Sequence, residues 1–536
     1  MQAQPRDRWF AALLALWGGF AVASIWLRPL WPVDETRYAS VAWEMWLRGD
    51  FLVPYINGEP YSHKPPLLFW LMHLGWAVFG VNDWWPRLVG PFCALGVLAL
   101  QQRLARLLWP DDADSRAMAA WVLCGTLLFA AMATLTMFDL LLALCVMIGM
   151  IGVVRAAHGE HRAGFLWLGA GIGLGVLAKG PVILLHLLPV ALVAPWWAPG
   201  ARAAPARWYA SLAAAVLLGA AIALAWALPA GYFGGEIYRR AIFWGQTAGR
   251  VSESFAHRAP FWYYLPLLPV ILFPWLVWPA LWRGLRAESF SRRDPGNRFL
   301  IAWLALTLVV FTLVSGKQAK YLVPMLPAFA LLAGIALARL PAPARRWEML
   351  LPACGFLALP ALFAYVRANP AAFALPPWAS ALPFWPAAAL ALAMPVLVWI
   401  GGRSTAVQAR ALAFAICGAF VAFGAGIVPA IAVYADPRPA AAHLAELQRQ
   451  ATPLAHLGKY HAQYNFVGRL EQSIEILDNP ELASWVAAHP AGQVIVVERN
   501  RHAGGDRRPE YETPFRGAWI QVWRGEALLL ERGAAR

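Results

Sequence analysis

Long apolar runs are the feature of this sequence that most limits how it can fold. About thirteen segments are apolar enough to cross a hydrocarbon layer of about 30 Å, for which about 20 helical residues suffice. They lie at residues 9–27, 86–108, 116–133, 136–155, 164–180, 181–197, 207–230, 261–283, 298–316, 320–340, 347–366, 382–401 and 409–434. The composition agrees, because 60% of the residues are hydrophobic and only 14% are charged. The sequence therefore predicts a polytopic α-helical membrane protein with about thirteen transmembrane helices.

The net charge of +15 follows from the expected membrane topology. With the N-terminus inside, arginines gather in alternate loops, as the positive-inside rule requires. They are Arg6, Arg8, Arg103, Arg106, Arg116, Arg155, Arg162, Arg202, Arg207, Arg283, Arg286, Arg292, Arg293, Arg298, Arg339, Arg345, Arg346, Arg403 and Arg410. This pattern accounts for the excess charge, so nucleic acid is not expected as a partner. It places the first loop (28–85), the loop 231–260 and the C-terminal tail on the outer face.

The hydrophobicity falls after about residue 434. A helical pattern, AAAHLAELQRQ, is followed by a β-like run, QVIVVE, and then by GAWIQVWRGEALLL. These patterns predict a transmembrane domain over residues 1–434 and a soluble α/β or α+β domain over residues 435–536. A tail of about 100 residues has an ordinary domain size.

Lysine is rare, and its positions are informative. Only five of the 44 basic residues are lysines, namely Lys64, Lys179, Lys317, Lys320 and Lys459. All five map to the outer face, where the positive-inside rule disfavours them. Lysines near helix ends also snorkel to lipid headgroups, and this explanation stays open for Lys317 and Lys320. An ammonium suits a phosphate oxygen, and Arg258 or Arg250 would add a bidentate grip, so the sequence predicts an anionic, phosphorylated ligand at the outer membrane face.

Acidic residues stand next to the apolar segments at two places. Asp34 and Glu35 follow the first span, and Asp139 begins the fourth. An acid near a helix N-terminus favours the helix dipole, and this alternative stays open for Glu35. A carboxylate close to the bilayer is costly and therefore indicates function. The helix expected over residues 36–47 is amphipathic and suited to lie in the membrane interface, where it would roof a cavity.

Several motifs occur in order and resemble one family. They are DETRYAxxAxEM, GDxxxPxxNGxxYxxKPPLxxW, RLxG, LAKGP, HxxPFWYY followed by PW, and SGKxxxYxxPxxPAxALLxG, spread over about residues 9 to 340. The set resembles the bacterial aminoarabinose-to-lipid A transferases, which belong to the polyprenyl-phosphate-sugar-dependent membrane glycosyltransferases together with the protein O-mannosyltransferases. The resemblance implies a GT-C fold with a C-terminal periplasmic domain, a lipid-linked sugar donor and an inverting transfer.

The resemblance also implies roles for single residues. Asp34 matches the catalytic acid of the first loop, with Arg37 and Tyr38 beside it. Asp139 matches the second acid and Lys64 the lysine before the double proline. The donor phosphate is expected to be held by six residues, which are Arg37, Tyr38, Lys179, Arg258, Lys317 and Tyr321.

The sequence departs from the family at one position. Related enzymes often carry an acid before the KPP lysine and a histidine before PFWYY, a pair that binds a divalent metal. Here the first position is His63 and the second is His257. Two imidazoles are candidates for a zinc site, but they lack the third or fourth protein ligand that such sites usually have. No cofactor is expected with certainty.

The function expected from this resemblance is transfer of 4-amino-4-deoxy-L-arabinose from undecaprenyl phosphate to a lipid A phosphate. A multi-pass monomer in the bacterial inner membrane, with its active site facing the periplasm, would carry it out. Two alternatives stay open, namely a protein or glycan O-glycosyltransferase that uses a polyprenyl-phosphate hexose, and a flippase for a lipid-linked saccharide. We expect the tail to shape access of the acceptor and to contribute no catalytic residue.

Overall fold

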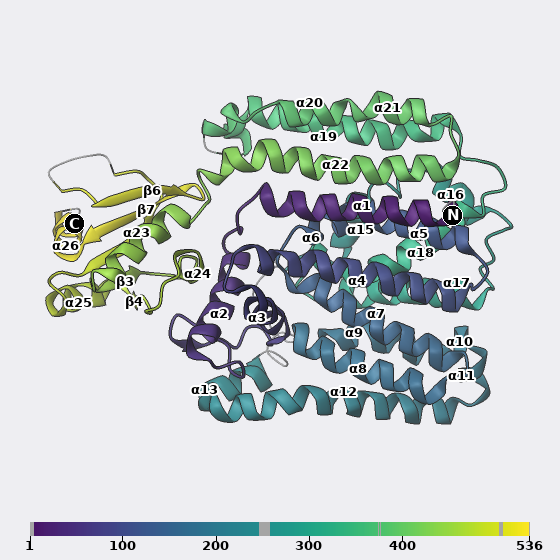
Figure 1. Cartoon of the computed structure of the whole chain (residues 1–536), viewed down its shortest axis with the longest axis horizontal. Coiled ribbons are helices and arrows are strands. Elements are labelled where there is room, and N and C mark those ends of the chain that lie inside the picture. Colours follow the sequence, from purple (N-terminus) through teal and green to yellow (C-terminus); the bar gives the residue numbers. More distant parts are fainter. Residues whose placement is uncertain (1–4, 246–257, 374, 376, 503–506, 535–536) are drawn as a thin grey trace.

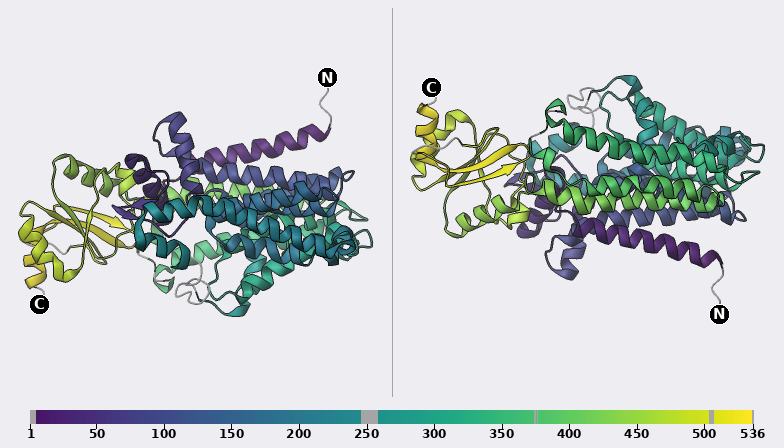
Figure 2. Two further views of the ribbon diagram at one scale, coloured as in Figure 1. Left: turned by 90° about the horizontal axis from the view of Figure 1, so that it is seen from below. Right: turned by 90° about the horizontal axis from the view of Figure 1, so that it is seen from above.

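The chain folds into a bundle of long helices with a smaller, sheet-containing domain at one end (Figure 1). The computed structural model describes residues 5–245, 258–373, 375, 377–502 and 507–534. The N-terminus lies at the end of the bundle opposite that domain, and the same arrangement is visible from both sides in Figure 2. Among the described residues, eight helices are long and apolar enough to cross a membrane, or nine if one bent pair forms a single span.

The helices of the bundle occupy most of the first 432 residues. They are α1 (Pro5–Trp26), α2 (Asp34–Arg48), α3 (Leu67–Phe79), α4 (Trp84–Leu108), α5 (Ala113–Cys124), α6 (Leu127–Ala133), α7 (Phe138–Ala157), α8 (His161–Lys179), α9 (Val182–Leu192), α10 (Ala194–Trp197), α11 (Pro199–Ala203), α12 (Pro205–Phe233), α13 (Gly235–Arg240), α15 (Tyr264–Ile271), α16 (Pro279–Arg286), α17 (Pro295–Leu313), α18 (Leu326–Ala338), α19 (Leu350–Ala368), α20 (Trp385–Ala391), α21 (Ala393–Ile400) and α22 (Thr405–Ala432). Short 3₁₀ turns join some of them, including η2 (Phe261–Tyr263) and η3 (Ala319–Met325).

The predicted number of spans is not confirmed, because several predicted segments are broken in the structure. The segment 116–133 forms α5 and α6, which meet at an angle of 63°. The break falls at Gly125, where a Cβ would lie 2.7 Å from the Cα of Ala413 on α22. The segment 181–197 forms α9 and α10, and 261–283 forms η2, α15 and α16. Hydrophobicity alone predicts continuous helices here. They are interrupted by close packing at Gly125 and by a proline at the start of α10.

Helices α7 and α8 form an antiparallel pair that packs unusually closely. A Cβ on Gly152 would lie 2.5 Å from the carbonyl oxygen of Gly164, and one on Gly171 would lie 2.6 Å from the amide nitrogen of Gly149. Small residues on facing helices let two backbones approach in a membrane protein. Because the chain turns between residues 157 and 161, the start of α7 and the end of α8 meet at the same end of the bundle.

The first long loop folds into α2, a small hairpin and α3 at the end of the bundle that faces the C-terminal domain (Figure 1). Gly49 ends α2 in the left-handed conformation, with φ +64°. Strands β1 (Tyr55–Ile56) and β2 (Glu59–Pro60) are joined by Asn57 and Gly58, both at positive φ. An Asn-Gly pair of this kind is the usual sequence for a two-residue hairpin turn.

The C-terminal domain is built on a mixed five-stranded sheet in the order β4-β3-β5-β7-β6. Its elements are α23 (Arg438–Arg449), β3 (Leu454–Leu457), α24 (Asn465–Gly468), β4 (Glu475–Leu477), α25 (Leu482–Ala488), β5 (Gln493–Glu498), β6 (Tyr511–Phe515), β7 (Ala518–Arg524) and α26 (Gly525–Ala534). Strands β4, β3 and β5 run parallel, and β7 and β6 continue the sheet antiparallel.

The two faces of this sheet bury separate cores. Ile495 of β5 points to a core that includes Leu444 of α23, whereas its neighbour Val494 points to one that includes Trp485 of α25. The run QVIVVE forms β5, in which successive side chains alternate between the faces. The structure thus contains an α/β unit where the tail was predicted, and the exact boundary at residue 434 stays a prediction.

The C-terminal domain is fastened to the first loop by specific hydrogen bonds. Ser40 Oγ donates to the carbonyl of Ala462 (2.7 Å), and Trp43 Nε1 donates to the carbonyl of Leu470 (2.9 Å). The side-chain amide of Asn57 both donates to and accepts from the backbone of Ile474, at 2.7 and 2.9 Å. Helix α2 therefore has one side against the bundle and another against the domain.

Candidate active site

A buried ion pair lies where α7 begins and α8 ends. Lys179 Nζ is 2.6 Å from Asp139 Oδ1, and the two side chains are 11% and 2% exposed. The close packing of α7 against α8 brings these residues together, although they are forty positions apart in the sequence. The sequence predicted a role for each residue separately and did not predict that they bind each other. Asp139 is thus placed to orient the ammonium of Lys179.

Phe138, next to Asp139, connects this ion pair to the first loop. Its ring meets that of Tyr38 edge-on, with centroids 4.9 Å apart, and the ammonium of Lys64 lies 5.6 Å from its centroid. The ammonium of Lys179 lies 5.2 Å from the ring centroid of Tyr321, a residue of η3. Predicted site residues from three distant segments therefore gather around two aromatic rings, which hold the cations by cation–π attraction.

Asp34 and Arg37 form a second ion pair one helical turn apart on α2. The Asp34 side chain is 43% exposed, so its carboxylate remains open to a ligand while Arg37 orients it. Burial raises the pKa of Tyr38, and the negative charge of Asp34 raises it further, so the phenol stays protonated at neutral pH. Burial alone would lower the pKa of Arg37, but Tyr61, Tyr38 and Asp34 outweigh that effect and raise it.

Glu35 has a different function from its neighbour. Its carboxylate is buried, forms an ion pair with Arg28 and accepts hydrogen bonds from the backbone N–H groups of Trp31 (2.8 Å) and Thr136 (2.5 Å). Because Thr136 lies two residues before α7, this carboxylate ties the start of α2 to the segment that carries Asp139. Capping of α2, the alternative left open by the sequence, describes only part of this role.

The segment after residue 258 lies against the SGK motif. Arg258 pairs with Gly316 in an isolated antiparallel bridge, and the N–H of Ala259 donates to the carbonyl of Ser315 at 3.3 Å. Lys317 is only 5% exposed, and its Nζ donates to the carbonyls of Ala259 (3.2 Å) and Val314 (2.6 Å). These hydrogen bonds use Lys317 to hold the two segments together, and its contact with a phosphate stays a prediction.

The predicted metal site is only partly within the described residues. His63 stacks on Tyr61, with ring centroids 5.3 Å apart, whereas His257 lies outside the described residues. In the part of the chain that the structure describes, no group of three or more histidine, cysteine or acidic side chains is arranged to hold a metal. His63 thus has an aromatic contact, and a zinc site stays a prediction.

The C-terminal domain brings a titratable group near α2 that sequence reasoning missed. His461 is half-buried, and its pKa is lowered by burial, then by the positive charges of Arg37, Lys459 and Arg516, against the opposing effect of Asp34. The tail was noted for its aromatic residues beside Lys459. The only signal in the sequence was a histidine in the same run, HLGKYHAQY. Its position next to α2 depends on tertiary contacts between residues more than 420 positions apart, such as Ser40 and Ala462.

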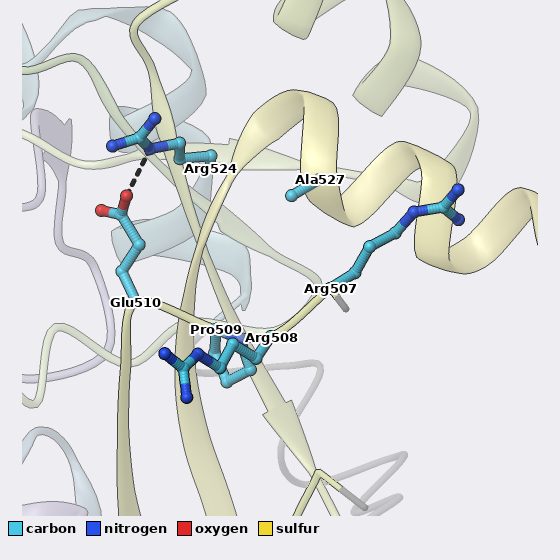
Figure 3. Close-up of a pocket in the computed structure, with 6 residues that line it drawn as sticks. All are labelled: Arg507, Arg508, Pro509, Glu510, Arg524 and Ala527. Carbon is cyan, nitrogen blue, oxygen red and sulfur yellow. Dashed lines mark hydrogen bonds and ion pairs between the residues drawn. The ribbon is translucent and has the colours of Figure 1, made fainter. Parts of the chain in front are cut away.

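A cavity of about 640 Å³ is lined only by residues of the C-terminal domain (Figure 3). Its charged groups are largely engaged with one another or with backbone. Arg524 binds Glu510, which also accepts from Gln493 at 2.6 Å, and Arg507 donates to the carbonyl of Leu530 at 3.0 Å. None of the predicted site residues lines this cavity, so we assign the candidate active site to the cluster around Asp34, Phe138 and Lys179.

Comparison with known proteins supports the sequence resemblance. The family model for dolichyl-phosphate-mannose-protein mannosyltransferase matches residues 63–233. An undecaprenyl phosphate-α-4-amino-4-deoxy-L-arabinose arabinosyl transferase from Pseudomonas paraeruginosa is 34% identical over 337 residues, which cover 62% of this chain and 60% of that protein. A protein of the same name from an Enterobacter species is 30% identical over 312 residues, or 57% of this chain and 55% of that protein. The chain thus matches about three fifths of the length of these curated relatives.

Two crystal structures show the same fold. ArnT from Cupriavidus metallidurans bound to undecaprenyl phosphate superposes with a TM-score of 0.72 and 20% identity, covering 96% of this chain and 97% of that protein. Its apo form gives a TM-score of 0.75 over 97% of this chain and 98% of that protein, again at 20% identity. The predicted fold class, a GT-C membrane fold, and the resemblance stated from the motifs are both confirmed.

Proposed function

Because the chain is a homologue of aminoarabinose transferases and shares the fold of one of them, we propose that it is a membrane glycosyltransferase with an undecaprenyl-phosphate-linked donor. The transferred sugar is 4-amino-4-deoxy-L-arabinose, and the acceptor is a lipid A phosphate at the periplasmic face of the bacterial inner membrane. The similarity to arabinosyl transferases of this kind supports the donor and the sugar. The lysines and acids at one end of the bundle support a phosphorylated ligand.

One observation carries this proposal. An open carboxylate, Asp34, stands beside a chain of contacts that runs through Tyr38 and Phe138 to the buried pair of Asp139 and Lys179. Carboxylate and cations are therefore fixed at a single end of a helix bundle, where the phosphate of a membrane-anchored donor would lie. Such preorganised charges stabilise charge that develops during a reaction more strongly than water does.

The reaction breaks the bond between the anomeric carbon of the sugar and the oxygen of the donor phosphate. The electron pair of that bond leaves with undecaprenyl phosphate, so negative charge grows on the departing oxygen. Lys179 is the cation fixed for this oxygen, because Asp139 and the ring of Tyr321 hold its ammonium in place. Arg258, whose backbone pairs with that of Gly316 beside Lys317, supplies a second cation for this phosphate.

The acceptor decides what Asp34 does. A phosphate monoester is largely ionised at neutral pH, since its second pKa is about 6, and it attacks the anomeric carbon without losing a further proton. With that acceptor, Asp34 positions and polarises the reacting groups, and Lys64 orients the acceptor phosphate. No step in this scheme requires a metal.

A hydroxyl acceptor is the second candidate, and the match of residues 63–233 to the mannosyltransferase family model favours it. A sugar or serine hydroxyl must lose its proton as it attacks, and a general base within hydrogen-bonding reach is then needed. Asp34 would be that base, since its carboxylate is 43% exposed.

Mass spectrometry of a deletion strain separates the two acceptors. We expect lipid A from the deletion strain to lack one pentosamine and to regain it with the wild-type gene but not with Asp34→Asn. Loss of a hexose from envelope glycoproteins, with unchanged lipid A, would contradict the proposal in favour of the hydroxyl acceptor. A flippase is excluded if the purified protein releases free undecaprenyl phosphate from the donor.

A further inference from the structure

Cationic residues from two separate parts of the chain influence His461, a residue of the C-terminal domain. Arg37 lies one turn along α2, Lys459 and His461 lie in the loop after β3, and Arg516 begins the turn between β6 and β7. Burial lowers the pKa of His461, the positive charges of Arg37, Lys459 and Arg516 lower it further, and the negative charge of Asp34 opposes them. Among these residues of the described chain, Arg37 and Asp34 form an ion pair with each other. The remaining cations give the cluster a net positive charge.

The loop that carries His461 is built onto α2. Ala462 takes a left-handed backbone with φ 53° and is almost completely buried. Ser40 donates to its carbonyl at 2.7 Å and accepts from the N–H of Phe466 at 3.0 Å, so one hydroxyl holds both sides of the turn. Phe466 in turn stacks on Trp76, with centroids 5.3 Å apart. Since Ser40 lies one turn beyond Arg37 on α2, the fixed loop places His461 beside Arg37.

Two sets of cations are therefore candidates for binding phosphate. One set, Lys179 and Arg258, belongs to the bundle, where Lys179 contacts Tyr321 and Arg258 pairs with Gly316. The other set, Lys459, His461 and Arg516, belongs to the domain beyond the ends of the helices (Figure 1). A donor whose polyprenyl chain stays in the bilayer presents its phosphate to the bundle set. The domain set is then left facing a second anion.

We propose that Lys459, His461 and Arg516 of the C-terminal domain form, with Arg37, a subsite that binds the phosphate monoester of the acceptor lipid next to Asp34. This proposal rests on the proposed function, since it assigns the acceptor of that same reaction. Lys459 and Arg516 are exposed and supply charge-assisted hydrogen bonds to phosphate oxygens. Ser40 acts as a positioning residue, because it fixes the loop without touching the ligand.

Binding at this subsite has a pH dependence with a defined sign. In the free protein the pKa of His461 is lowered by burial and by Arg37, Lys459 and Arg516, with Asp34 opposing. A bound phosphate adds negative charge beside the imidazole and raises that pKa, so His461 takes up a proton on binding. Affinity for the phosphorylated acceptor should therefore increase as the pH falls from about 8 to about 7, above the range near about 6 in which the phosphate takes up its own second proton. His461→Gln should remove this increase.

The test compares the binding of three lipids by the full-length protein in detergent. The probes are lipid A, the same lipid A with its phosphates removed, and undecaprenyl phosphate, with inorganic phosphate as a competitor. The variants are Lys459→Ala, Arg516→Ala and His461→Gln. Arg508→Ala is the matched control, because Arg508 is an exposed arginine of the same domain that lines the separate cavity in Figure 3. Melting temperatures on the same preparations confirm that each variant is folded.

We expect Lys459→Ala and Arg516→Ala each to weaken lipid A binding about tenfold, the loss of one charge-assisted contact. Undecaprenyl phosphate affinity should stay within about twofold of wild type, since the bundle holds that phosphate. The subsite would be overturned if the variants bound lipid A as tightly as the wild type does. It would also be overturned if they lost the same affinity for lipid A and for undecaprenyl phosphate. Displacement by inorganic phosphate, without discrimination between the two lipid A forms, would show a simple anion site and overturn it as well. If binding behaves as expected but no sugar is transferred, the proposed function fails while the subsite stands.

Discussion

The ion pair of Asp139 and Lys179 allows stability and activity to be separated. Its charged atoms are 2.6 Å apart, and the side chains are 2% and 11% exposed. Removing one partner of a buried pair leaves an uncompensated charge, which typically costs about 3–5 kcal/mol, whereas replacing both with uncharged groups costs much less. We therefore expect Asp139→Asn and Lys179→Met each to lower the free energy of unfolding by about 3 kcal/mol, and the double variant to recover at least about 2 kcal/mol of the summed loss.

Denaturant unfolding in mixed micelles measures these free energies, and donor turnover is measured on the same preparations. Glu236→Gln is the control, because the pair of Glu236 with Arg240 is 59% and 75% exposed and should contribute less than about 1 kcal/mol. Turnover should be lost in Lys179→Met and stay lost in the double variant, even though the fold recovers. Additive single losses, or losses no larger than that of Glu236→Gln, would refute the argument that Asp139 stabilises and orients Lys179.

Three further predictions follow from the same geometry. Asp34→Asn keeps the shape of the side chain and removes its charge, so turnover should fall at least about 10²-fold with an unchanged melting temperature, and near-normal turnover at equal protein concentration would contradict its assignment. Gly171→Leu places a side chain where a Cβ would lie 2.6 Å from the backbone of Gly149, so it should destabilise the protein by about 1–3 kcal/mol and weaken undecaprenyl phosphate binding by displacing Lys179. Gly418→Leu on α22, where a Cβ meets no atom within 4 Å, is the comparison. Truncation after residue 434 removes the hydrogen-bond partners of Ser40 and Trp43, so donor affinity and melting temperature should decline together. Intact donor binding by the truncated protein would show instead that α2 folds without the domain.

The last of these revises what the sequence alone suggested. From the sequence we expected the tail to shape acceptor access without influencing the donor site. The structure instead has α2 bound to residues 462–470, so the helix that carries Asp34 depends on the domain for part of its packing. Such contacts join residues more than 420 positions apart and leave no local pattern in the sequence.

The sequence predicted the elements whose signals are local. The amphipathic pattern of residues 36–47 predicted a helix, and α2 spans Asp34–Arg48. Asp139 was recognised because a carboxylate beside a bilayer is costly, and Lys179 because lysine is disfavoured on the outer face; both lie at ends of long apolar helices. The β-like run QVIVVE forms β5. The Asn-Gly turn at residues 57–58 was a local signal as well, although it was read only as part of a motif.

What the sequence did not reveal depends on packing in three dimensions. Hydrophobicity does not distinguish a continuous span from α5 and α6, because the bend follows from the close approach of Gly125 to α22. Adjacent acids look alike in sequence, yet Asp34 is open and Glu35 is buried against Arg28. Lys317 and Lys179 look equally suited to phosphate, but Lys317 donates to two backbone carbonyls. Only the fold separates positioning groups from those that face a ligand.

The most direct test of the central claim is transfer by the purified protein. The wild type and Asp34→Asn are incubated in detergent with undecaprenyl-phosphate-linked aminoarabinose and lipid A, and both lipid products are measured by mass spectrometry. The account predicts that wild type releases one free undecaprenyl phosphate for each lipid A that gains a pentosamine, and that Asp34→Asn releases at least about 10²-fold less. Donor that remains intact with wild-type protein, or pentosamine that appears on lipid A at the same rate without an ionised Asp34, would contradict it.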